Sequence, residues 1–223
     1  MPDAESFTYQ VRKCRSESCG MRYPCQADYT FKERCPRCGA PTDLVGVQAA
    51  GALERHAAEV AQPSALALEA LLDNVRSAWN VGSIFRSADG AGFSRLHLCG
   101  VTPTPEYPPV LKTSLGAEKS LPWTHHLDGL QAASRLIETG RRLWALENDP
   151  AAGTLYEIPR AIINPSQGGA IVLVVGNEVC GVDAGILALC ERVLYLPMRG
   201  LKRSYNVAVA FGIAAHYLGW LAA

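Results

Sequence analysis

Four cysteines near the start of the chain have the type and spacing of a structural metal site. Cys14 and Cys19 form one close pair, Cys35 and Cys38 form a second pair, and a glycine follows each pair. Four thiolates brought together in this way give the tetrahedral ligand set that Zn²⁺ prefers in structural sites. Glycine after each pair permits a tight turn whose backbone amides point toward the sulfurs. We therefore expect residues 1–44 to form a small zinc ribbon that folds around Zn²⁺.

Two questions about this segment stay open. A fifth cysteine, Cys25, lies between the pairs and is interpreted as a spare thiol, although exchange with Cys19 is possible, and a redox-active pair is the alternative to a metal site. Several cations here could contact phosphate or simply form a solvated surface, because acidic residues nearly balance them. These cations are Arg12, Lys13, Arg15, Arg22, Lys32, Arg34 and Arg37.

Three glycine-containing segments farther along the chain follow apolar runs and could hold a ligand. They read NVGSIFRSADGAG at 80–92, VVGNEVCGVD at 174–183 and LPMRGLKRSYNVAVAFGI at 196–213. The sequence has no G-x-G-x-x-G string and no Walker A loop, so it does not indicate a dinucleotide-binding or P-loop site. Gly176 permits close backbone approach at the end of a strand, and Leu196 and Met198 could form apolar walls for a purine.

Together the three segments resemble the three motifs of the SpoU (TrmH-like) RNA 2′-O-ribose methyltransferases of the SPOUT superfamily. The resemblance covers residues 65–223 with the motifs in the expected order, and Tyr205 replaces the usual leucine. The matching residues are Asn80, Gly82, Ile84, Arg86, Ser87 and Ala88 in the first motif, Gly176, Glu178 and Gly181 in the second, and Pro197, Met198, Gly200, Ser204, Asn206 and 207–210 in the third.

This resemblance implies an α/β fold with a deep trefoil knot whose turns bind S-adenosylmethionine. It assigns the cofactor to five positions, which are Gly176, Leu196, Met198, Gly200 and Tyr205. It also implies a substrate, the ribose 2′-hydroxyl of a structured tRNA or rRNA. Methylation of a base is disfavoured, because the first motif has the pattern of the ribose-modifying subfamily.

The same resemblance implies a catalytic set of Arg86, Asn206, Asn80 and Glu178. Arg86 could accept the proton of the hydroxyl with help from a phosphate or water, or it could stay charged and stabilise the developing alkoxide. Structural alternatives also exist, since Asn80 could cap a helix, Glu178 could pair with an arginine and Ser204 could cap the last helix.

RNA binding requires a local basic patch, because 21 Lys and Arg residues offset 21 Asp and Glu residues. Arg199, Lys202 and Arg203 lie within five positions beside the expected cofactor site. They form either a track for RNA phosphates or an ordinary solvated loop.

The elements that must position these residues follow from apolar runs. Runs that suit buried strands lie at 65–71, 95–99, 142–146, 170–175 and 193–196, and most precede a helical segment. Alternating strands and helices predict a mainly parallel sheet, covered on both faces, for the methyltransferase domain at 65–223. The Ala-, Glu- and Gln-containing segment at 45–64 predicts a linker helix.

Composition places the chain among globular proteins, with 48% hydrophobic and 19% charged residues over 223 positions. No secretory signal is visible at 1–13, so we expect a cytoplasmic protein. The charge-free run 204–223 is a poor candidate for a membrane helix, and no membrane association is expected. We expect this final helix to form a homodimer through Phe211, Ala214, Ala215, Leu218 and Trp220.

One alternative from another functional class is kept. The chain could be a non-catalytic, zinc-containing RNA-binding factor that retains the knotted fold. The complete pair of Arg86 and Asn206 favours the enzyme.

Overall fold

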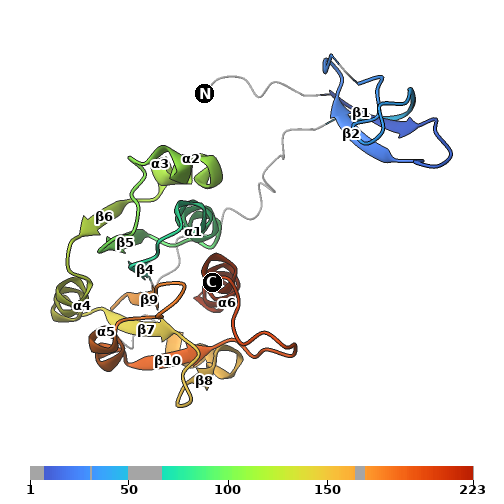
Figure 1. Cartoon of the computed structure of the whole chain (residues 1–223). Coiled ribbons are helices and arrows are strands. Elements are labelled where there is room, and N and C mark those ends of the chain that lie inside the picture. Colours follow the sequence, from blue (N-terminus) through green and yellow to red (C-terminus); the bar gives the residue numbers. More distant parts are fainter. Residues whose placement is uncertain (1–7, 31, 50–66, 164–168, 223) are drawn as a thin grey trace. The chain divides into compact units, whose positions relative to one another are not determined.

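The computed structural model describes residues 8–30, 32–49, 67–163 and 169–222 (Figure 1). The chain divides into two compact units, Met1–Val60 and Ala61–Ala223. Each unit has its own sheet, and the two are described separately.

The N-terminal unit is a three-stranded antiparallel sheet in the order β2-β1-β3. Its strands are β1 (Thr8–Cys14), β2 (Arg22–Gln26) and β3 (Thr42–Ala49). The prediction of a helix over 45–64 is therefore wrong at 45–49, where β3 pairs with β1. Val45 and Val47 are β-branched and suit a strand, and pairing with β1 satisfies the backbone groups of β3. The remainder of the predicted helix lies outside the described residues.

The C-terminal unit is built on a seven-stranded sheet in the order β6-β5-β4-β9-β7-β10-β8, and every pair of neighbouring strands is parallel. Its strands are β4 (Leu68–Asp73), β5 (Arg95–Cys99), β6 (Trp123–His126), β7 (Arg142–Leu146), β8 (Gly153–Thr154), β9 (Ile171–Val175) and β10 (Arg192–Tyr195). Its helices are α1 (Ala78–Gly90), α2 (Pro108–Ser114), α3 (Ala117–Ser120), α4 (Gly129–Glu138), α5 (Ala184–Leu189) and α6 (Val207–Ala222), with two 3₁₀ turns, η1 (Leu155–Glu157) and η2 (Arg160–Ile163).

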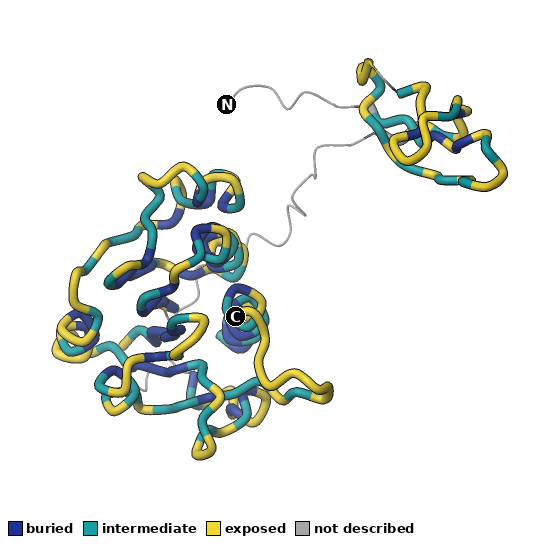
Figure 2. The backbone as a smooth tube through the Cα atoms, viewed as in Figure 1, coloured by how far each residue is buried: buried dark blue, intermediate teal, exposed yellow. Residues whose placement is uncertain are grey.

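Helices cover both faces of this sheet, as the alternating pattern predicted. Residues of α1, α2 and α6 pack with Leu68, Ala70 and Leu72 on one face, whereas α4 and α5 pack with Leu71 and Cys99 on the other. Figure 1 shows α1 and α6 on the side opposite α4 and α5, and Figure 2 shows buried backbone in the middle of this unit. The central strands β4 and β9 are buried at every position. Strands covered on both faces are apolar at consecutive positions, which is why their sequences read as continuous runs.

The predicted strands at 95–99, 142–146, 170–175 and 193–196 match observed strands within one residue. The predicted strand at 65–71 begins at Leu68 within the described residues and ends at Asp73. β6 and β8 were not predicted, because both are edge strands with polar residues in short sequences.

The final helix corrects the dimer prediction. Phe211, Ala214, Ala215 and Leu218 are buried in the core of their own chain, so they form no free surface. Trp220 alone of the predicted set is exposed. Among the described residues, no helix is long and apolar enough to cross a membrane.

One charged cluster lies inside the sheet. Glu69 on β4 accepts hydrogen bonds from His97 on β5 and from Arg141 before β7, each at 2.9 Å. Burial alone would raise the pKa of Glu69, but these two partners outweigh it and lower the pKa to about 2. The carboxylate therefore stays ionised inside the sheet, because His97 and Arg141 both donate to its Oε2.

Candidate active site

A cavity of about 270 Å³ lies at the carboxyl ends of β7, β9 and β10. Ligands of open parallel α/β sheets bind at this edge, where the turns that follow the strands come together. The cavity is lined by residues 146–148, 175–179, 181, 195–196, 203–207 and 210. Three of the five predicted cofactor residues line it, namely Gly176, Leu196 and Tyr205.

Met198 and Gly200 do not line the cavity, although the sequence assigned both to the cofactor. Met198 is half-buried, and Gly200 is exposed with open space around its Cα. Sequence reasoning missed Glu147 and Asn148, which line the cavity directly after β7. The sequence feature that could have identified them is a pair of polar residues directly after an apolar strand.

The turn after β9 shapes one wall of the cavity. Asn177 and Gly181 exchange backbone hydrogen bonds of 3.0 and 2.9 Å, and Gly181 has a φ of +76° that favours glycine. A Cβ at Gly176 would collide with the backbone of Gly181 and Val182. Gly176 is therefore required for packing of this turn against its own chain, whereas the sequence suggested close approach to a ligand.

Glu178 holds the start of α1 in place. Its carboxylate accepts hydrogen bonds from the backbone N–H of Arg76 (2.9 Å), the backbone N–H of Ser77 (3.0 Å) and the side-chain amide of Asn80 (2.9 Å). Partial burial would raise the pKa of Glu178, but these hydrogen bonds outweigh it and lower the pKa. Glu178 is thus an anion bound at a helix N-terminus, and within the described residues it has no arginine side chain as a partner.

Asn206 connects the third motif to the first. Its amide nitrogen donates to Oδ1 of Asn80 at 3.1 Å, across 126 positions of sequence. Its own Oδ1 accepts hydrogen bonds from the backbone N–H groups of Ala208 (2.9 Å) and Val209 (3.4 Å), which caps α6. A chain of hydrogen bonds from Glu178 through Asn80 to Asn206 therefore joins all three motifs.

The structure shows that neither Asn80 nor Ser204 caps a helix with its side chain, as the sequence alternatives had suggested. The N-cap of α1 is Ser77, whose hydroxyl accepts a hydrogen bond from the backbone N–H of Asn80 at 3.4 Å, so Asn80 itself lies within the first turn. At α6 the side chain of Asn206, rather than that of Ser204, accepts the first free N–H groups. Because Asn206 caps α6 with its Oδ1, its side-chain nitrogen remains available to donate to Asn80.

Arg86 lies apart from this network. It is exposed on α1, six residues after Asn80, which corresponds to about 9 Å along the helix axis. Among the described residues it has no hydrogen bond or ion pair, and it does not line the cavity. The fold of one chain therefore leaves this guanidinium free for another molecule.

The loop between β10 and α6 carries the basic residues singled out in the sequence. Arg199, Lys202 and Arg203 are all exposed. Arg203 lines the cavity, and its carbonyl oxygen accepts a hydrogen bond from the Asn148 side chain at 3.0 Å. The loop thus places positive charge at the cavity mouth.

A larger groove of about 1100 Å³ runs along α1 and α6. Asn80 and Asn206 line the groove, and Asn206 also lines the cavity, so the two hollows meet at Asn206. The groove is lined by Trp79, Asn80, Ser83, Ser87, Thr113, Tyr156, Asn206, Ala208, Val209, Gly212, Ile213, His216, Tyr217 and Trp220. Trp79 is 57% exposed and Trp220 is 62% exposed, so large apolar side chains face solvent here. An apolar surface of this kind commonly contacts another macromolecule.

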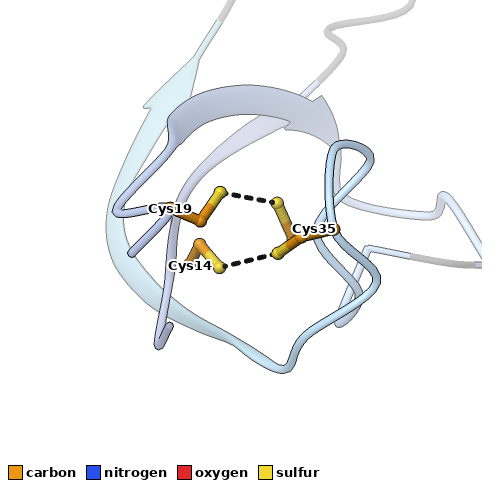
Figure 3. A group of neighbouring side chains, drawn as sticks. Cys14, Cys19 and Cys35 are labelled. Atoms are coloured by element: carbon orange, nitrogen blue, oxygen red, sulfur yellow. Dashed lines mark hydrogen bonds between the residues drawn. The ribbon is translucent and has the colours of Figure 1, made fainter. Parts of the chain in front are cut away.

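The N-terminal unit brings the four predicted metal ligands together. Figure 3 labels three of them, Cys14, Cys19 and Cys35. The sulfurs of Cys14, Cys19, Cys35 and Cys38 all lie within 4.8 Å of one another, and the Cys14–Cys38 and Cys19–Cys35 pairs are 3.5 and 3.7 Å apart. A tetrahedral Zn²⁺ with Zn–S bonds of about 2.3 Å places its sulfurs about 3.8 Å apart, so the cluster fits this ion. Cys25 is not part of the cluster.

The turns around the cysteines support metal binding. Gly20 and Gly39 have positive φ values of 54° and 73°, as expected for tight turns after each pair. Burial raises the pKa of both Cys14 and Cys35, and the neighbouring thiols raise that of Cys14 further. At Cys35, hydrogen bonds from the backbone amides of Cys38 and Arg37 outweigh burial and lower the pKa. Amides directed at a sulfur favour the thiolate form that binds metal.

Known proteins resemble the C-terminal unit, which contains the cavity. Residues 67–216 match the SpoU rRNA Methylase family. The chain is 32% identical over 154 residues to the 23S rRNA (guanosine(2553)-2′-O)-methyltransferase RlmP of Bacillus subtilis, which covers 66% of this chain and 56% of that protein. It is 30% identical over 150 residues to a tRNA (guanosine(18)-2′-O)-methyltransferase of Thermus thermophilus, covering 66% of this chain and 71% of that protein.

Solved structures share the fold. An AdoMet-bound rRNA methyltransferase from Sinorhizobium meliloti superposes with a TM-score of 0.62 at 24% identity, covering 70% of this chain and 57% of that one. A TrmH/SpoU tRNA modifying enzyme from A. aeolicus gives 0.60 at 23% identity, covering 72% and 76%. The chain spans a little over half the length of the first curated relatives that it matches.

Proposed function

Because the chain belongs to the SpoU rRNA Methylase family, we propose that it is an RNA 2′-O-ribose methyltransferase that uses S-adenosylmethionine. The observation that carries this proposal is the hydrogen-bonded chain from Glu178 through Asn80 to Asn206, which joins the three family motifs beside the cavity. The names of the relatives support structured RNA, either rRNA or tRNA, as the substrate class.

The cavity fits the cofactor in its chemistry. Leu146, Val175 and Leu196 provide apolar surface for an adenine ring, and Glu147 provides a carboxylate that could accept hydrogen bonds from hydroxyl groups. Tyr205 occupies the position of the usual leucine and forms part of the same wall. When bound, S-adenosylmethionine supplies a methyl group on a sulfonium, which is a good leaving group.

The residues of this chain contribute mainly orientation and charge. Asn80 and Glu178 are positioning residues, since they fix the first turn of α1, while Asn206 faces both the cavity and the groove. The free guanidinium of Arg86 is the group that we propose to act on the acceptor hydroxyl. It does so either as a proton acceptor assisted by phosphate or water, or as a cation that stabilises the alkoxide. Arg199, Lys202 and Arg203 supply positive charge for the RNA backbone beside the cavity.

We further propose that the chain has the deep trefoil knot of its superfamily. The insertion of β9 between β7 and β4, the first strand of this unit, supports this topology, as does a cavity formed by the ends of three neighbouring strands. Structural Zn²⁺ on Cys14, Cys19, Cys35 and Cys38 is part of the same proposal, as is action in the cytoplasm, where a reducing environment keeps thiolates available for zinc.

The direct test of the function is mass spectrometry of ribose-methylated nucleosides in tRNA and rRNA from cells with and without this gene. We expect one 2′-O-methylated nucleoside to disappear with the gene and to return when purified protein and S-adenosylmethionine are added to the RNA. RNA binding without any methyl transfer would instead favour the non-catalytic RNA-binding factor.

The cofactor site can be tested separately by calorimetry. Leu196→Asn removes apolar surface from the cavity wall, and we expect the Kd for S-adenosylmethionine to rise at least about tenfold. The matched control is Leu201→Asn, because Leu201 is fully exposed in the same loop. Equal affinities of the two variants would place the cofactor elsewhere.

The apolar groove supports a homodimer. We expect light scattering at micromolar concentration to give twice the chain mass of 24.0 kDa. Ile213→Asp places a charge in the groove and should shift the protein to the monomer, since desolvating an unpaired carboxylate opposes association. Val179→Asp is the control, because Val179 is 82% exposed and lies outside the groove. A monomeric wild-type protein would contradict the proposal.

A further inference from the structure

The two faces of the N-terminal sheet have different surroundings. Arg12 on β1 is buried, and its guanidinium donates to the hydroxyl of Thr42 at 2.9 Å and to its carbonyl at 3.1 Å. Tyr23, the partner of Arg12 on β2, donates to the carbonyl oxygens of Lys32 and Arg34. The segment that carries the second cysteine pair therefore covers this face of the sheet.

The opposite face carries exposed cations. Side chains alternate along a strand, so Lys13 points away from the face of Arg12. In the register of the sheet Lys13 lies directly between Arg22 on β2 and Asp43 on β3, which places all three side chains in one row. Arg15 lies two positions beyond Lys13 on the same face and pairs with Asp43 through its Nε at 2.8 Å.

The charges in this row do not balance. Asp43 is the single carboxylate of the row and it forms its ion pair with Arg15. Lys13 and Arg22 lie directly opposite each other, and neither forms an ion pair among the described residues. Like charges at directly opposite positions of an antiparallel pair destabilise a sheet. The free energy of unfolding of this unit is expected to be small, because few of its side chains are buried. A repulsive pair is therefore costly here. An external anion at this row would remove the repulsion.

We propose that the face formed by Lys13, Arg15 and Arg22 binds the phosphate backbone of RNA. Exposed Pro24 and half-buried Tyr9 lie farther along the same face, and a face that carries both cations and an aromatic ring suits single-stranded or looped RNA. The choice of RNA over another polyanion rests on the proposed function. The N-terminal unit is then a second RNA-binding surface with its own cations, separate from the basic loop at the cavity.

The test uses the full chain with labelled bulk tRNA as the probe. The double variant Lys13→Gln and Arg22→Gln removes the two unpaired cations and also the like-charge pair. We expect the Kd for tRNA to rise about tenfold and the slope of log Kd against log salt to fall by about 2, one for each lost phosphate contact. Because the repulsion is also removed, the zinc content should be unchanged and the melting temperature of the variant should not fall.

The control is the double variant Lys119→Gln and Arg135→Gln, which removes two exposed cations from the C-terminal unit. A Kd for the Lys13 and Arg22 variant within twofold of wild type, or an equal loss in the control, overturns the inference. Methyl transfer at saturating RNA separates the two proposals. If wild-type protein binds tRNA through this face yet transfers no methyl group, the inference stands and the proposed function fails.

Discussion

Replacing Arg86 with alanine is expected to reduce methyl transfer to RNA by at least about a thousandfold, while the affinity for S-adenosylmethionine changes less than twofold. The exposed guanidinium has no partner among the described residues and lies outside the cavity, so its removal costs neither fold nor cofactor contacts. Loss of one group that stabilises developing negative charge typically costs about 10²–10³ in rate, and loss of orientation adds to this. Single-turnover transfer of a labelled methyl group measures the rate, and calorimetry measures the affinity.

Two further variants sharpen this result. Arg86→Lys keeps the charge but loses the planar pair of donors, so retained activity would indicate charge stabilisation and lost activity would indicate bidentate contact or proton transfer. Arg135→Ala is the matched control, because Arg135 is also an exposed arginine on a helix of the same unit. Near-normal transfer by Arg86→Ala would remove Arg86 from the catalytic set.

Removing half of the metal ligands is expected to unfold the N-terminal unit. Of its described side chains, those of Arg12, Cys14, Cys35 and Thr42 are the buried ones, so two of the four belong to the metal site and there is almost no apolar core. Structural Zn²⁺ contributes about 10–16 kcal/mol of binding free energy in small zinc domains, which exceeds the stability of most domains. The double variant Cys35→Ser and Cys38→Ser should therefore lose both zinc and the protection of β1–β3 from proteolysis.

The chain offers its own control for this prediction. Cys25→Ser removes a thiol of the same unit that is not part of the cluster, and it should retain one equivalent of zinc by elemental analysis. Less than half an equivalent in wild-type protein purified without chelator, or full zinc in the double variant, would refute the metal site. The C-terminal unit should keep its affinity for S-adenosylmethionine in either variant.

The parallel sheet could be predicted because its strands are buried on both faces. The run 171–175 is apolar at every position and 95–99 keeps Leu96, Leu98 and Cys99, so local sequence carries that signal directly. The same reasoning fails at the edges of the sheet, where Trp123–His126 forms a strand with polar residues. It also fails at 45–49, where helical composition is outweighed by long-range pairing of β3 with β1.

The candidate site, too, could be predicted from the sequence only in part. Motif spacing identified Asn80, Glu178 and Asn206, and the structure brings these residues together. Two things could not be predicted, because they depend on three-dimensional packing. One is which face of α6 its own core buries, since α6 is apolar nearly all round. The other is that Arg86 is exposed and does not line the cavity of its own chain.

The two glycines at positions 82 and 176 provide a way to sort related sequences. A Cβ at Gly82 would strike the hydroxyl of Thr113 and the carbonyl of Val110 on α2, and a Cβ at Gly176 would strike the backbone of the following turn. Both positions therefore indicate whether a chain can fold in this way, whereas Arg86, in the catalytic role proposed above, would indicate whether it can react. A relative that keeps both glycines and lacks the arginine is expected to be a folded pseudoenzyme, and one that lacks the glycines has a different backbone at these points.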